Sequence, residues 1–182
     1  MEYYFDTETT GTDPTKHKII TIQWQLLDRS SGEPVGELQI LKEWESSEKE
    51  ILKEFLPKIQ CDYRWNFIAI GKNLLFDFNF LDKRIEKWGL TDFRRFDLAY
   101  CQDRVFLDLK HPIVLMNNSQ FVGYNEVLDK DGSLEGVNAK MKELYDNEKY
   151  DEIIDYIKKE AGITIEAFKM LKKQMPSLRK HL

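Results

Sequence analysis

Two carboxylates stand two residues apart near the start of the chain, at Asp6 and Glu8. The residues before them are aromatic, as is typical of a strand. Side chains two apart on a strand point to the same face, so we expect these carboxylates to project together. Such a pair offers oxygen ligands to a hard divalent cation. The same spacing at Asp146 and Glu148, in a hydrophilic helical stretch, indicates only a solvated surface.

A third carboxylate, Asp77, follows a short apolar segment and a Gly71-Lys72-Asn73 turn. The pattern places it at the start of a helix. Such a residue often caps the helix, a contribution of about 1 kcal/mol. It can also bind a metal, and the two roles are compatible.

A fourth carboxylate, Glu160, lies four residues after Tyr156 in a long helical pattern. Residues at this spacing share one helix face. By itself the pair indicates an amphipathic helix. Asp155 is a competing acid beside it, and its spacing from Tyr150 is one residue longer than that between Tyr156 and Glu160.

Three segments together resemble the DEDD superfamily of ribonuclease-H-like exonucleases. The first is Phe5-Asp6-Thr7-Glu8-Thr9-Thr10-Gly11, and the second, residues 71–81, matches the pattern N-x-x-F-D-x-x-[FY]-L. The third, residues 156–164, is similar to the Y-x-x-x-D segment of the tyrosine branch, with Glu160 where the family has Asp. The resemblance spans residues 2–172 and is greatest to the exonuclease domain of family-B DNA polymerases.

This resemblance implies a metal-dependent 3′→5′ exonuclease that acts on the 3′ end of single-stranded or frayed DNA or RNA and releases nucleoside 5′-monophosphates. It implies two divalent cations, Mg²⁺ or Mn²⁺, held by Asp6, Glu8, Asp77 and Glu160. The catalytic residues are then Asp6, Glu8, Asp77, Tyr156 and Glu160. The substrate-binding residues are Thr9, Thr10, Gly11, Asn73 and Phe76.

Two alternatives remain open at this point. Glu160 in place of Asp, together with the acidic net charge, is compatible with a nucleic-acid-binding module of the same fold and weakened catalysis. The site is also compatible with a phosphodiesterase acting on dinucleotides or short oligonucleotides.

The elements that must position these residues form an α/β pattern. We predict a ribonuclease-H-like mixed five-stranded sheet, three antiparallel strands then parallel strands, flanked by helices. The predicted strands are 1–9, 18–27, 35–41, 66–70 and 96–99. The predicted helices are 48–59, 76–88, 134–145 and 151–175, with Trp88 facing inward and a helical pattern already from about residue 105.

The bulk properties fit one globular domain over residues 1–182. A net charge of −5 argues against tight non-specific duplex binding.

Cys61 and Cys101 are too far apart for a zinc knuckle or a redox pair, and we expect buried thiols. The basic residues between 169 and 182 predict a solvated helix face or a patch that holds a strand. No signal peptide or membrane span is visible, so we expect a cytoplasmic protein without a membrane partner.

Overall fold

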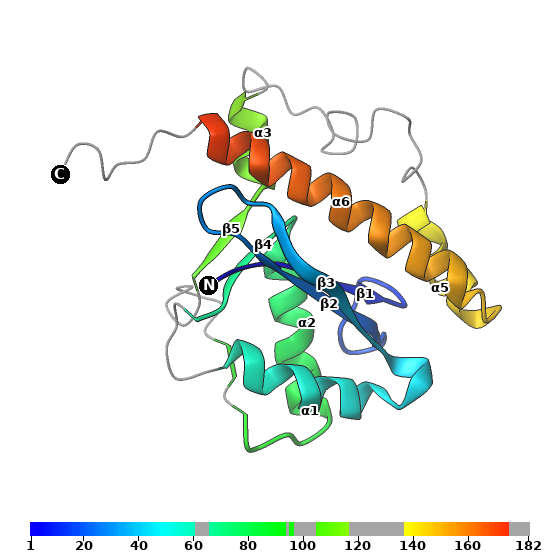
Figure 1. The fold of residues 1–182 in the computed structure, drawn as a ribbon. Coiled ribbons are helices and arrows are strands. Elements are labelled where there is room, and N and C mark those ends of the chain that lie inside the picture. Colours follow the sequence, from blue (N-terminus) through cyan, green and yellow to red (C-terminus); the bar gives the residue numbers. More distant parts are fainter. Residues whose placement is uncertain (61–65, 94, 97–104, 117–136, 175–182) are drawn as a thin grey trace.

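The computed structural model describes residues 1–60, 66–93, 95–96, 105–116 and 137–174 (Figure 1). Several sequence predictions fall outside this part of the chain. They are the two cysteines, Cys61 and Cys101, most of the predicted strand 96–99, and residues 175–182 of the basic C-terminal segment.

A mixed five-stranded sheet forms the centre of the fold, with strand order β3-β2-β1-β4-β5. The pairs β1–β2 and β2–β3 are antiparallel, whereas β1–β4 and β4–β5 are parallel. The predicted fold class is thereby confirmed. The strands are β1 (Glu2–Thr9), β2 (Ile19–Leu27), β3 (Pro34–Lys42), β4 (Ile68–Gly71) and β5 (Phe106–Asp108).

The fifth strand of the described sheet, β5, occupies Phe106–Asp108, within the region that we expected to be helical. Of the predicted strand 96–99 only Phe96 is described, and it packs against Phe78 with ring centroids 5.6 Å apart. A three-residue strand has too few positions to show an alternating pattern. It forms because Ala69, Ile70 and Gly71 of β4 offer it a free edge. Tertiary pairing, rather than local propensity, makes this strand.

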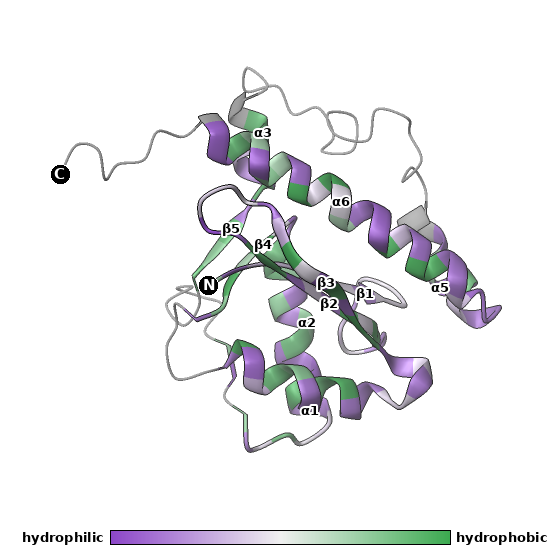
Figure 2. Cartoon of the chain, in the orientation of Figure 1, coloured by the Kyte–Doolittle hydropathy of each residue, from purple (hydrophilic) through white to green (hydrophobic). Residues whose placement is uncertain are grey.

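Helices cover both faces of the sheet (Figure 1). α1 and α2 lie on one face, and α6, with α5 beside it, lies on the other. Hydrophobic and hydrophilic residues alternate along α1 and α6 in Figure 2, as amphipathic helices require. The helices are α1 (Glu48–Ile59), α2 (Leu74–Lys87), α3 (Lys110–Met116), α5 (Val137–Asp146) and α6 (Tyr150–Gln174), with a 3₁₀ turn η1 (Glu43–Glu45) before α1.

The alternation of β1 decides which way the carboxylates face. Phe5 stacks on Phe55 of α1 at 5.2 Å, whereas Tyr4 belongs to the hydrophobic cluster that contains Phe168 of α6. Asp6 and Glu8 follow Tyr4 at intervals of two, so they project toward α6.

The C-terminal end of α2 differs from the prediction. Trp88 follows the last residue of the helix and is 38% exposed, instead of facing inward. Its indole N–H donates to the buried Glu48 carboxylate at 2.8 Å. This bond holds the ring at the surface.

Within the described part of the chain, no helix combines the length and apolar character needed to cross a bilayer.

Candidate active site

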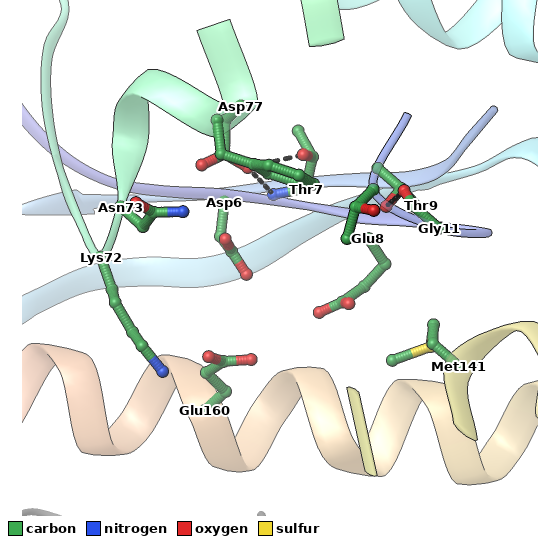
Figure 3. Close-up of a pocket in the computed structure, with 12 residues that line it drawn as sticks. Asp6, Thr7, Glu8, Thr9, Gly11, Lys72, Asn73, Asp77, Met141 and Glu160 are labelled. Carbon is green, nitrogen blue, oxygen red and sulfur yellow. Dashed lines mark hydrogen bonds between the residues drawn. The ribbon is translucent and has the colours of Figure 1, made fainter. Parts of the chain in front are cut away.

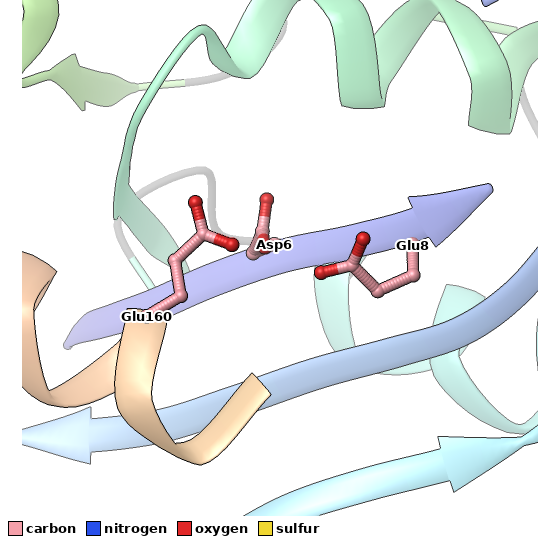
Figure 4. A group of neighbouring side chains, drawn as sticks. All are labelled: Asp6, Glu8 and Glu160. Atoms are coloured by element: carbon pink, nitrogen blue, oxygen red, sulfur yellow. The ribbon is translucent and has the colours of Figure 1, made fainter. Parts of the chain in front are cut away.

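The four predicted carboxylates line one pocket at the end of β1, with a cavity volume of about 260 Å³ (Figure 3). Oxygens of three of them, Asp6, Glu8 and Glu160, lie within 4.8 Å of one another (Figure 4). Asp77 approaches from the N-terminal turn of α2 on the opposite side of β1. Segments up to 154 residues apart in the sequence therefore meet here.

A side chain of β2 orients Asp6. The amide Nε2 of Gln23, a fully buried residue, donates to Oδ2 of Asp6 at 3.0 Å. The hydroxyl of Thr21 donates in turn to Oε1 of Gln23 at 2.9 Å, which fixes the amide with its N–H₂ toward the carboxylate. Gln23 and Thr21 are the cross-strand partners of Asp6 and Glu8. The antiparallel register thus supplies a polar support beneath the acids.

Glu8 is a buried carboxylate whose Oε1 has no hydrogen-bond partner among the described residues. Burial raises its pKa well above the usual range, and the negative charges of Glu160 and Asp77 raise it further. Lys72 opposes this shift. The pKa of Asp6 is raised for the same kind of reason, by burial first and then by Glu160. A buried oxygen without a partner is costly unless something else binds it.

Asp77 is held against β1. Both the backbone N–H and the hydroxyl of Thr7 donate to its Oδ1, at 3.0 and 2.6 Å. Burial raises the pKa of Asp77 to about 8, although the hydrogen bonds from Thr7 act in the opposite direction. This carboxylate is therefore tied to the strand that carries Asp6 and Glu8.

Asp77 does not cap its helix, because Asp108 of β5 does so. The Asp108 carboxylate accepts the backbone N–H groups of Asn73 and Leu74, at 3.0 and 3.1 Å. A capping group from a neighbouring strand satisfies the first donors of α2 and leaves Asp77 for the pocket.

The turn before α2 depends on two special backbone positions. A Cβ on Gly71 would lie 2.5 Å from the carbonyl oxygen of Phe5, so β4 can approach β1 this closely only with glycine. Asn73 has a left-handed φ of 57°, which asparagine tolerates better than most residues. These two residues direct the start of α2 toward the end of β1.

The third segment behaves as its helical spacing predicted. Glu160 is buried in the pocket, whereas the competing acid Asp155 is exposed on α6. Tyr156 is buried and hydrogen-bonded to Glu160. Burial raises the pKa of Tyr156, and the charges of Glu160 and Glu8 add to this effect. Its phenol is therefore a neutral donor that supports the Glu160 carboxylate.

Four of the five predicted substrate-binding residues line the pocket: Thr9, Gly11, Asn73 and Phe76. Thr10 points elsewhere. Its N–H donates to the carbonyl of Lys18 and its hydroxyl accepts the Lys18 N–H, at 3.0 and 3.2 Å, and it lines a neighbouring cavity.

Sequence reasoning missed four further residues that line the pocket, Thr7, Thr12, Lys72 and Met141. Figure 3 shows Lys72 and Glu160 extending toward one another from opposite walls. The position of Lys72 beside Asn73, in the second motif, is the sequence feature that could have identified this residue. Met141 comes from α5, and nothing local in the sequence marks it.

The donor set fits a hard divalent cation. All the groups are carboxylate oxygens, which Mg²⁺ and Mn²⁺ prefer over nitrogen or sulfur ligands. A bound cation would give the unpartnered oxygen of Glu8 a ligand to bind. It would also offset the repulsion between the carboxylates that raises their pKa values.

Comparisons with known proteins place the chain in a superfamily. A family model described as the RNase_H superfamily matches residues 3–149, and the chain belongs to this superfamily. No curated protein matches the sequence significantly.

Among solved structures, the fold resembles that of exonuclease I. The product-bound form of exonuclease I aligns with a TM-score of 0.57 at 14% identity, covering 99% of this chain and 45% of that one. Exonuclease I of E. coli in complex with a dT13 oligonucleotide aligns with a TM-score of 0.56 at 15% identity, covering 99% and 42%. The chain thus spans less than half the length of these proteins, which at this identity share its fold.

Proposed function

We propose that this chain is a metal-dependent 3′→5′ exonuclease that hydrolyses phosphodiester bonds of single-stranded or frayed DNA or RNA. The observation that carries the proposal is the convergence of four carboxylates in one pocket, with a buried oxygen of Glu8 left without a partner among the described residues. Membership of the RNase H superfamily supports a nuclease. The single-domain organisation is inferred from the chain length and composition, and the 3′→5′ polarity and the DEDD tyrosine subtype from the sequence resemblance.

Asp6, Glu8 and Glu160 would hold one cation, and Asp6 with Asp77 a second. Two bound divalent cations supply activation of the attacking water and stabilisation of the departing 3′-oxygen. Gln23 holds Asp6 in place, and the Tyr156 hydroxyl does the same for Glu160.

The remaining lining residues would bind the terminal nucleotide. Phe76 offers an aromatic face, Asn73 a polar side chain, and Gly11 a wall without a side chain. Lys72 is the cation among the described lining residues, and it would contact the scissile phosphate. Release of nucleoside 5′-monophosphates is the expected result.

The test is incubation of the purified protein with 3′- and 5′-labelled DNA and RNA strands, in Mg²⁺, Mn²⁺ or EDTA. Mononucleotides should accumulate from 3′ ends only with metal. The proposal fails if no condition gives cleavage, and strand binding without cleavage would instead support the weakened binding module.

Glu160→Gln and Asp155→Asn form a matched pair on α6 for this assay. Loss of activity is expected in Glu160→Gln alone, because Asp155 is exposed outside the pocket. Loss in Asp155→Asn with retention in Glu160→Gln would overturn the assignment of the fourth acid.

A further inference from the structure

A second cavity, of about 670 Å³, adjoins the carboxylate pocket. The two share a wall built from the segment that follows β1 and from α5. Thr9 and Met141 line the carboxylate pocket, and the next residues in sequence, Thr10 and Lys142, line the second cavity. Gly11 of the first pocket packs directly on His17 of the second, since a Cβ there would lie 2.6 Å from Nε2.

The charge of this cavity is opposite to that of its neighbour. Four lysines and Arg84 line it, against three carboxylates, on a protein whose net charge is −5. Among the described residues, Lys16 and Lys142 pair only with exposed carboxylates, which hold a lysine weakly. Lys87 forms no ion pair within the described part of the chain. Lys16, Lys87 and Lys142 are therefore available to a ligand with negative charge.

The cavity also presents a fixed aromatic ring, Trp88. Glu48 accepts its indole N–H, and the same carboxylate binds Arg84 through Nε at 2.7 Å and through Nη2. Both Glu48 and Arg84 are buried, so the network is rigid. The ring is oriented while 38% of the residue stays exposed. An exposed ring that cannot turn away offers a stacking surface at little entropic cost.

We infer that this cavity is a subsite for single-stranded nucleic acid, which binds the nucleotides that precede the 3′-terminal one. Lysines beside a fixed indole recognise phosphate and base together, which is the chemistry of a nucleotide chain. Because the two cavities share a wall, this subsite lies next to the carboxylate pocket. The inference extends the proposed function and rests on it for the direction of the strand.

Anisotropy of a fluorescein-labelled dT10 strand tests the inference in EDTA, where hydrolysis is blocked. Trp88→Leu should weaken binding about tenfold, because base–aromatic stacking is lost, whereas Trp88→Phe should stay near wild type. Both variants lose the bond to Glu48, so a purely structural effect would weaken both equally and overturn the inference.

Salt dependence gives a second readout. Lys87→Gln should lower the slope of log affinity against log salt by about 0.7, the value for one phosphate contact to a single strand. Lys53→Gln replaces an exposed lysine on α1 that does not line the cavity, and it should leave the slope unchanged. An unchanged slope in Lys87→Gln, absence of dT10 binding by the wild type, or preference for a polyglutamate peptide would overturn the subsite.

Activity separates this inference from the proposed function. In an active enzyme, Trp88→Leu should lower the ratio of kcat/KM for dT10 to that for a dinucleotide. If the wild type binds dT10 through Trp88 but cleaves nothing, the subsite stands and the exonuclease fails. If the wild type cleaves and Trp88→Leu changes neither affinity nor the ratio, the exonuclease stands and the subsite fails.

Discussion

The two adjoining cavities differ in whether their buried charges are paired. In the cation-lined cavity the buried charges are paired, since Glu48 accepts hydrogen bonds from Arg84, Trp88 and the backbone of Ile19. In the carboxylate pocket, like charges face one another and an oxygen of Glu8 has no partner among the described residues. Removing one partner of a buried ion pair destabilises the fold, whereas buried like charges repel one another until a ligand of opposite charge binds. The difference supports the proposal that the carboxylate pocket binds cations, whereas the paired network of the other cavity orients Trp88.

Breaking the paired network should have the largest effect. Glu48→Gln leaves Arg84 buried without its counter-charge, and the free energy of unfolding should fall by about 3–5 kcal/mol. Urea denaturation measures this. The control Glu50→Gln removes an exposed pair on the same helix and should change the value by less than about 1 kcal/mol. Equal effects of the two substitutions would contradict the comparison.

Neutralising a carboxylate in the other pocket should have the opposite effect on stability. Asp6→Asn removes one of several repelling charges, so Tm in EDTA should rise. Nuclease activity should fall more than about 100-fold, because even residues that only support metal ligands are worth 10–100-fold. Differential scanning fluorimetry and the strand assay give the two values. A lower Tm in EDTA would show that the carboxylates are not mutually destabilising.

A substitution of Gln23 should have a smaller effect on the same pocket, because it leaves all four acids in place. Gln23→Leu removes the support of Asp6 while preserving all four acids, and Mn²⁺ affinity should weaken about tenfold. Gln25→Leu on the same strand is the control, because the Gln25 amide donates to the backbone carbonyl of Gly36 and does not line the pocket. Isothermal titration measures both. Unchanged affinity in Gln23→Leu would limit this residue to packing.

The pH dependence of the metal-free protein should show an effect that is spread over several pH units. The pKa of Asp77 in the folded state is about 8, above the usual value near 4, so the folded state binds its proton more tightly than the unfolded state. Stability contributed by this proton is present at low pH and is lost as pH rises from about 4 to 8, by at most about 1.4 kcal/mol per unit. In EDTA, Tm of the wild type should fall across this range more steeply than that of Asp77→Asn. Parallel profiles of Tm against pH for the two proteins would show that Asp77 does not cause this pH dependence.

Local periodicity predicted which side chains share a face, and the resemblance of three segments to the DEDD superfamily predicted that the acids converge. The spacing of two placed Asp6 and Glu8 on one face, and the spacing of four placed Tyr156 with Glu160. Helix α1 matches its predicted bounds because its apolar spacing is regular.

Features that depend on contacts between distant segments were not predicted. The strand β5 and the cap supplied by Asp108 exist only through pairing with β4 and α2. Trp88 is exposed because Glu48, forty residues earlier, accepts its N–H. Gln23 supports Asp6 through the antiparallel register, which no single segment encodes.

Mn²⁺ binding to the metal-free protein, followed by isothermal titration, tests the central claim most directly. We expect saturable binding that Glu8→Gln abolishes or weakens strongly, and that Glu148→Gln, which alters the matching pattern outside the pocket, leaves intact. Absence of Mn²⁺ binding by the wild type, or equal binding by both variants, would contradict the account.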